Sequence, residues 1–213
     1  MLGCNSNFTY EHYTNILQEL RKSYKFTSFK SATTNDVILR HDVDASLHAA
    51  LKMAKIEKEL DISSTFFILF SSEFYNPISV DGSKIIREIL DLGHKLGLHY
   101  NEFFIFENNI DAIETITTEI NLLEQHFNTK IEAIAAHERA LAESKSGKKL
   151  SVKLPDTIID AYSKEFFEER KYLSDSGQFW REGCLCQNLN KYERLQVLIH
   201  PMWWSHGGLS RDE

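Results

Sequence analysis

The chain has 213 residues, of which 42% are hydrophobic and 12% aromatic, so it can bury one sizeable core and is short for two domains. Its 24 Lys and Arg against 31 Asp and Glu give a formal net charge of −7. This charge disfavours nucleic acid or an anionic membrane surface as the main partner. We therefore expect one domain that acts on a neutral or weakly charged molecule.

The cysteines and the apolar segments indicate the cellular compartment in which the protein is expected. No basic start precedes an apolar run near the N-terminus, and no uncharged apolar stretch could cross a bilayer. Cys184 and Cys186 lie only two positions apart, where a disulfide between them would be strained, and Cys4 leaves the count odd. A lone Cys-x-Cys is a weak zinc pattern. We interpret the three as structural free thiols and expect a cytoplasmic protein without membrane insertion.

Helices and strands alternate in the first part of the chain. Apolar residues at helical spacing predict an amphipathic helix over 8–24 that covers the outside of the core. The apolar run 37–39 ends abruptly in charge, as a buried strand does at its carboxyl end. A helix over 47–60 and a continuous apolar strand over 64–70 complete a β-α-β unit.

The alternation continues to the C-terminus. Apolar spacing predicts helices near 85–90 and over 110–127, and the polar, basic stretch 141–154 is typical of a surface loop or a lid. Further strands are expected at 96–100, 131–136, 157–160, 172–174 and 195–199. Such alternation predicts a mostly parallel sheet, open or closed into a barrel.

Active sites in parallel sheets gather beyond the carboxyl ends of the strands. Four of the expected strands end in groups able to do chemistry, namely Asp42 with Asp44, His99, His137 and His200. The sequence therefore predicts that these side chains meet at one edge of the sheet.

Asp42 and Asp44 are two positions apart, so in an extended segment their side chains point the same way. A divalent metal would keep both carboxylates ionised, so that one binds the metal and the other accepts a proton. Alternatively, Asp44 is only the N-cap of a helix that begins near residue 45.

The histidines carry alternatives of the same kind. Imidazole is a common zinc ligand, so His99 and His137 are candidate ligands, although His137 could instead bond a neighbouring carbonyl. His200 precedes an aromatic segment that includes Trp203, which suits protonation of a leaving group beside a sugar ring. The alternative for His200 is a core histidine beneath a tryptophan. We interpret His94, at a helix end, as structural.

Taken in order, the segments LRHDVD, STFFILF, DLGHKLGLHY, YLSDSGQFW and VLIHP resemble the polysaccharide deacetylase family, also called the NodB-homology family or carbohydrate esterase family 4. The resemblance covers residues 37–204 of a single domain spanning 1–213, with 1–30 as a helical cover. Within this family, the chain looks like the short cytoplasmic-type members with an RHDVD opening, which are often associated with bacterial surface-polysaccharide synthesis. It implies a distorted (β/α) barrel with a metal, usually zinc, at the carboxyl ends of the strands.

The resemblance also implies roles for individual residues. Asp42 would be the general base, Asp44 a metal ligand and His200 the general acid, while Arg139 would pair with Asp42. Residues expected to orient groups or to bind substrate are Arg139, Asp175, Trp180 and Trp203.

One position departs from the family pattern. The family carries a second metal histidine four residues after the first, where this chain has Phe103, which cannot bind a metal. His137 is our preferred replacement, Asn101 and Glu102 are alternatives, and a site without metal is the remaining one.

These observations predict a zinc-dependent hydrolase that removes an acetyl group, N-linked or O-linked, from a sugar or polysaccharide precursor. One rival is a degenerate, metal-free barrel that binds carbohydrate. Another reads Asp42 to Asp44 as the D-x-D of a glycosyltransferase, although the chain has no phosphate-cradling glycine loop. The sequence leaves the oligomeric state open.

Overall fold

The computed structural model describes residues 8–139, 143, 150, 155 and 157–205. Within them, eight parallel strands form one sheet in the order β6-β5-β4-β3-β2-β8-β7, with β1 paired to β2 off this path. The strands are β1 (Lys25–Thr27), β2 (Asp36–Val43), β3 (Thr65–Leu69), β4 (Lys95–Asn101), β5 (Ala133–His137), β6 (Ile159–Asp160), β7 (Lys171–Ser174) and β8 (Arg194–Ile199).

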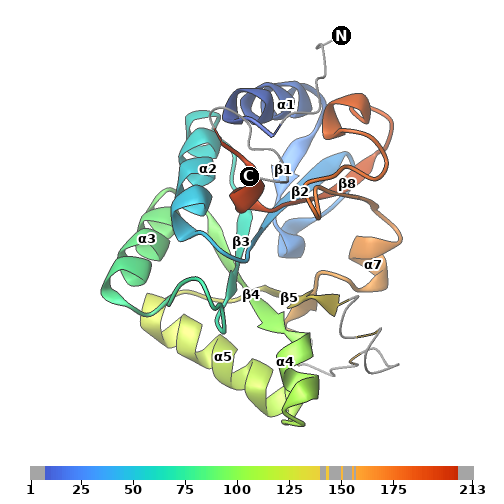
Figure 1. Ribbon diagram of the computed structural model, residues 1–213. Helices are drawn as coiled ribbons and strands as arrows, with labels where there is room; N and C mark the ends of the chain where they lie inside the picture. The colour runs from blue at the N-terminus through green and yellow to red at the C-terminus, as the bar shows by residue number, and fades with distance from the viewer. Residues whose placement is uncertain (1–7, 140–142, 144–149, 151–154, 156, 206–213) are drawn as a thin grey trace.

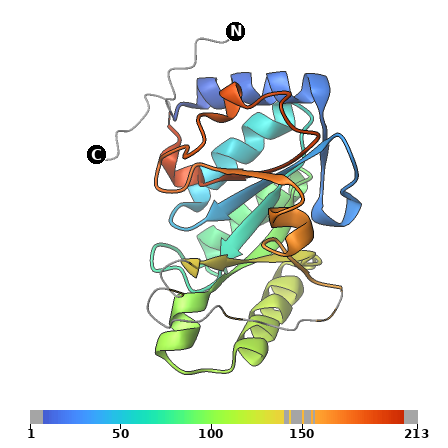
Figure 2. The ribbon, with the colours of Figure 1, turned by 90° about the vertical axis from the view of Figure 1, so that its right-hand side faces the viewer.

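Helices cover the outer side of this curled sheet. In Figure 1 the helices α1, α2, α3 and α5 follow one another around it, and Figure 2 shows the same cover from the side. The helices are α1 (Tyr10–Ser23), α2 (Leu47–Glu59), α3 (Val80–Asp91), α4 (Glu102–Glu107), α5 (Ala112–Phe127) and α7 (Lys164–Phe167). The expected α/β fold, a distorted (β/α) barrel, is confirmed as a half-barrel of parallel strands.

The central strand β2 is buried along all eight of its residues. Val37 and Leu39 face outward into the cluster under α1, whereas Ile38 faces inward to Phe29 and Phe67. This two-residue alternation follows from the pleat. It sets which side chains of β2 reach the inside of the barrel and which pack against the helices.

Backbone pairing does not join β6 to β7 among the described residues. Aromatic side chains meet there instead, since Tyr162 and Phe167 both contact Tyr172, with ring centroids 6.3 and 4.9 Å away. Side-chain packing thus takes over where the ladder of hydrogen bonds ends.

The short elements β1, α4 and α7 were not predicted from the sequence. β1 has only three residues, and the apolar segment of α4 carries no period that separates helix from strand. The predicted loop 141–154 lies outside the described residues except at 143 and 150. In the described part, no helix is both long and apolar enough to cross a membrane.

Candidate active site and metal centre

Arg40 and Asp42 share the inward face of β2 with Ile38, because they follow it at intervals of two. Arg40 donates to Asp42 through Nε at 3.2 Å and Nη2 at 2.8 Å. Its guanidinium lies 4.7 Å from the ring centroid of Tyr162 and 5.1 Å from that of Phe67. Burial raises the pKa of Asp42, but the positive charges of Arg40, His99 and His200 together outweigh burial, so this pKa lies below its ordinary value. Asp42 is therefore held as a carboxylate.

Asp44, His99 and His137 bring three ligand atoms into a nearly equilateral triangle. The distances are 3.2 Å from His99 Nε2 to Asp44 Oδ1, 3.3 Å from His137 Nδ1 to the same oxygen, and 3.2 Å between the two nitrogens. Tetrahedral zinc with ordinary Zn–N and Zn–O bonds needs ligand atoms about 3.3 Å apart. Ser46, not Asp44, caps the following helix α2. The role of Asp44 is therefore in the triangle of ligand atoms and not at the start of α2.

Hydrogen bonding fixes the direction of His99. Its Nδ1 lies 2.9 Å from the carbonyl oxygen of Ala135, which can only accept, so Nδ1 carries the proton and Nε2 of the neutral ring offers a lone pair. Asp44 Oδ1 is buried with no hydrogen-bond partner. When the His99 ring is neutral, two acceptors therefore face each other, and a proton from His137 or a charged His99 would be needed between them. A divalent cation satisfies all three atoms, so these residues fit a metal.

The other proposed replacements for the missing histidine are engaged elsewhere. Asn101 caps α4, and Glu102 Oε1 accepts from the backbone N–H of Leu150 at 2.9 Å. Phe103 lies on α4 itself. Among the described candidates, His137 is the one whose ring nitrogen lies against the other two ligand atoms.

His200 stands beside the triangle and is oriented by a buried carboxylate. Its Nδ1 lies 2.6 Å from Asp175 Oδ1, and its Nε2 lies 3.9 Å from Asp44 Oδ2. Asp175 also accepts from the backbone N–H of His200 at 3.0 Å and from Trp204 Nε1 at 2.8 Å. Burial lowers the pKa of His200, but Asp175, together with Asp42 and Asp44, outweighs burial and raises this pKa to about 9. In the absence of metal, His200 is therefore an imidazolium at neutral pH.

One cavity of about 790 Å³ is lined by Asp42, by the three residues of the triangle and by His200. Its aromatic wall includes Tyr162, Phe167, Tyr172 and Trp180. The polar residues at its chemical end are Asp42, Asp44, His99, His137 and His200. The five strand-end residues that the sequence picked out thus line the same cavity.

The arginine that pairs with Asp42 is not the expected one. Arg40 makes both hydrogen bonds to Asp42, whereas Arg139 lies 4.9 Å from the ring centroid of Tyr162 and lines the cavity. The sequence held a signal for this pairing. The alternation that sets Asp42 and Asp44 on one face also includes position 40.

Of the two tryptophans proposed to bind substrate, Trp180 and Trp203, only the first lines the cavity. Trp180 lines the cavity, as proposed, and its ring stacks on that of Phe8. Trp203 is not among the cavity-lining residues and packs against the cluster under α1. Its neighbour Trp204, for which the sequence predicts no role, is buried and donates a hydrogen bond from Nε1 to Asp175.

The chain matches no protein-family model and no curated protein. Several solved structures are similar to it. A peptidoglycan deacetylase mutant from Bacillus subtilis has a TM-score of 0.48 at 13% identity, covering 80% of this chain and 76% of that one. A Streptococcus pyogenes deacetylase in complex with acetate has 0.46 at 15%, covering 91% and 82%. A family 4 carbohydrate esterase pseudoenzyme from Bacillus anthracis has 0.45 at 13%, covering 79% and 56%. At such identities, function must be argued from the site itself.

Proposed function

We propose that this chain is a metal-dependent hydrolase that removes an acetyl group, N-linked in its natural substrate, from a sugar or polysaccharide precursor. The observation that carries the proposal is the triangle of Asp44, His99 and His137, with Asp42 and His200 in the same cavity. A Lewis acid, a base and an acid at one place are the groups that amide hydrolysis needs.

Asp44, His99 and His137 would hold the metal, for which their nitrogen and oxygen donors favour zinc. When bound, the metal would polarise the acetyl carbonyl and lower the pKa of a water molecule. The carbonyl of Ala135 fixes the tautomer of His99, so that this ring is ready to bind without rearrangement.

Asp42 would take the proton of the attacking water. Its pairing with Arg40 keeps it ionised and fixes both carboxylate oxygens. His200 would protonate the departing amine, because Asp175 orients its ring and favours its charged form. Acid–base participation of this kind contributes about a hundred- to ten-thousand-fold in rate.

The aromatic wall of the cavity suits a sugar ring. Faces of Tyr162, Tyr172 and Trp180 offer the apolar contact that the hydrogen-bearing side of a pyranose accepts. The link to surface-polysaccharide synthesis rests only on the sequence resemblance to short deacetylases. We propose it as the biological setting of the reaction.

The test is release of acetate from N-acetylglucosamine oligomers by protein loaded with zinc. Asp42→Asn should abolish release while zinc content stays near that of the unchanged chain, and Asp91→Asn, at an exposed position of α3, serves as the matched control. Full activity of Asp42→Asn would refute the assignment of the base.

A second candidate function is carbohydrate binding without catalysis, which Phe103 favours because it removes the family's usual ligand. It predicts a folded protein that binds N-acetylglucosamine oligomers, holds no stoichiometric transition metal and releases no acetate. Zinc at one equivalent bound through His137 excludes it.

A further inference from the structure

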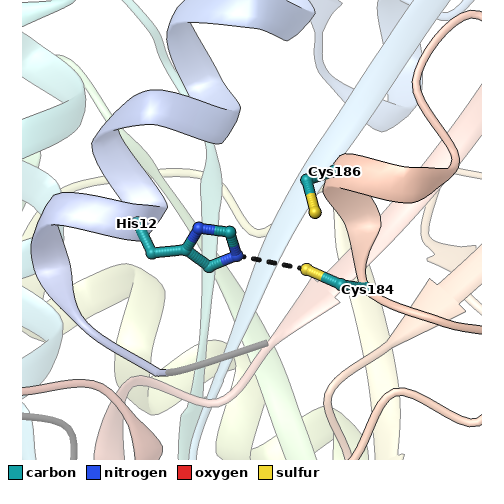
Figure 3. Close-up of side chains that lie close together, drawn as sticks. All are labelled: His12, Cys184 and Cys186. Carbon is teal, nitrogen blue, oxygen red and sulfur yellow. Dashed lines mark hydrogen bonds between the residues drawn. The ribbon is translucent and has the colours of Figure 1, made fainter. Parts of the chain in front are cut away.

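A second cluster of metal-ligating side chains lies between α1 and η2 (Leu185–Gln187), beside the apolar cluster that covers the outward face of β2. His12 Nε2 lies 3.2 Å from Cys184 Sγ, although 172 positions separate them in sequence. Figure 3 shows the His12 ring and the sulfur atoms of Cys184 and Cys186 turned toward a common point. One ligand atom from each lies within 4.8 Å of the other two.

The two cysteines differ in oxidation state. Cys184 is a free, buried thiol, whereas Cys186 is disulfide-bonded. The prediction of structural free thiols is thus wrong for Cys186. A thiolate from Cys186 becomes available only when its disulfide is reduced.

We propose that reduction of the Cys186 disulfide creates a zinc site formed by His12, Cys184 and Cys186. Tetrahedral zinc with ordinary Zn–S and Zn–N bonds sets ligand atoms about 3.5–3.8 Å apart. The His12–Cys184 contact is 3.2 Å and the other separations do not exceed 4.8 Å, so the three ligand atoms already lie near the spacing that zinc requires. The fourth position is taken by water or another donor.

The surroundings favour a metal over a solvated polar contact. His12 and Cys184 are both buried. The His12 ring is stacked with that of Trp204, with centroids 6.5 Å apart, and Cys184 belongs to the same apolar cluster as Trp180 and Trp204. Two thiolates and an imidazole suit a borderline cation such as zinc and are poor ligands for magnesium or calcium. Exclusion of water strengthens the binding of the thiolates to the cation.

The position of the site gives it a consequence for the cavity. Cys184 directly follows Gly183 and comes four residues after Trp180, both of which line the cavity. Zinc at this point would tie α1, through His12, to the segment that forms the cavity wall. The proposed zinc is therefore structural and redox-dependent, and it is separate from the catalytic metal.

Cobalt provides a spectroscopic test that does not depend on activity. The full chain is reduced with a phosphine, which converts the disulfide and one water into two thiols and a phosphine oxide, and Co²⁺ is then added. A sulfur-to-cobalt charge-transfer band in the near ultraviolet should grow to one equivalent. It should vanish in Cys184→Ser and in Cys186→Ser and weaken in His12→Ala, while His48→Ala, at an exposed histidine, leaves it unchanged.

The two metal sites are distinguished by their ligands, because Asp44, His99 and His137 contain no sulfur. His99→Ala should therefore keep the band whether or not the proposed function holds, and it should lose acetate release if that function is correct. Circular dichroism checks that each cysteine variant is folded, with Cys184→Ala as a second variant. The absence of a band at saturating Co²⁺, its persistence in folded Cys184→Ser, or its full growth without the phosphine would overturn the proposal.

Discussion

The buried ion pair between Arg40 and Asp42 couples stability to catalysis, and the two effects can be separated by substitution. The side chains are 0% and 2% exposed. Asp42→Asn leaves the guanidinium without its counter-charge, which costs about 3–5 kcal/mol in unfolding free energy. Contacts that Arg40 keeps with Tyr162 at 3.0 Å and Gln196 at 3.5 Å place the loss toward the lower end. The loss of a general base should lower the rate of acetate release by about 100- to 10,000-fold.

The double variant Arg40→Met with Asp42→Asn removes both charges together. It should recover most of the lost unfolding free energy, because no buried charge is left alone, yet remain inactive. Urea unfolding followed by circular dichroism gives the stability, and acetate release by zinc-loaded protein gives the rate. Recovery of both stability and activity would contradict the role of Asp42.

Arg40→Met alone tests the electrostatic part of the reasoning. The pKa of Asp42 is depressed when Arg40 is present, so the carboxylate persists even below its ordinary pKa and is protonated only when pH falls through the lowered value. Without Arg40, burial raises this pKa, and the acidic limb of the pH–rate profile should move to higher pH. An unchanged acidic limb in Arg40→Met would show that the pair does not set the charge of the base.

Three further outcomes are expected. Because Asp175 raises the pKa of His200 to about 9, the stabilisation from this pair is full below the unfolded pKa and is lost as pH rises through 9. Asp175→Asn should therefore move the basic limb of the pH–rate profile downward, and an unmoved limb would count against the pair. His137→Ala removes one of three ligands. It should weaken zinc binding by at least about ten-fold, because mutation of a residue that only supports a ligand already weakens metal binding by that much. Undiminished zinc in metal analysis would show that His137 is not a ligand. Gly97→Ala places a Cβ 2.6 Å from the Phe67 ring, which should cost about 1–3 kcal/mol in urea unfolding, and an unchanged midpoint would refute the clash.

Hydrophobic periodicity was sufficient for the main elements of the fold. The buried strands β2, β3, β4, β5 and β8 and the helices α1, α2, α3 and α5 coincide with predicted elements to within a few residues. β1 was missed since three residues carry too little pattern, and α4 because its apolar run resembles an extension of β4. Short elements depend on tertiary packing, which periodicity does not record.

The strand-end rule was sufficient for the candidate site. The rule groups five residues at the ends of the expected strands, and the structure places all five around one cavity: Asp42, Asp44, His99, His137 and His200. Long-range pairings were beyond sequence reasoning. Nothing near His12 signals that it meets Cys184 from the other end of the chain.

The alternation along β2 also has a consequence for how the chain folds. Arg40 and Asp42 point inward, while His41 points outward, where its Nε2 meets the buried Glu57 at 2.7 Å. A slip of β2 by one residue would exchange these sets, turning Arg40 and Asp42 toward the apolar cluster under α1 and separating His41 from Glu57. Every register shifted by an odd number of residues carries this cost in free energy. The residues proposed for catalysis thus also disfavour one-residue shifts in the pairing of the central strand.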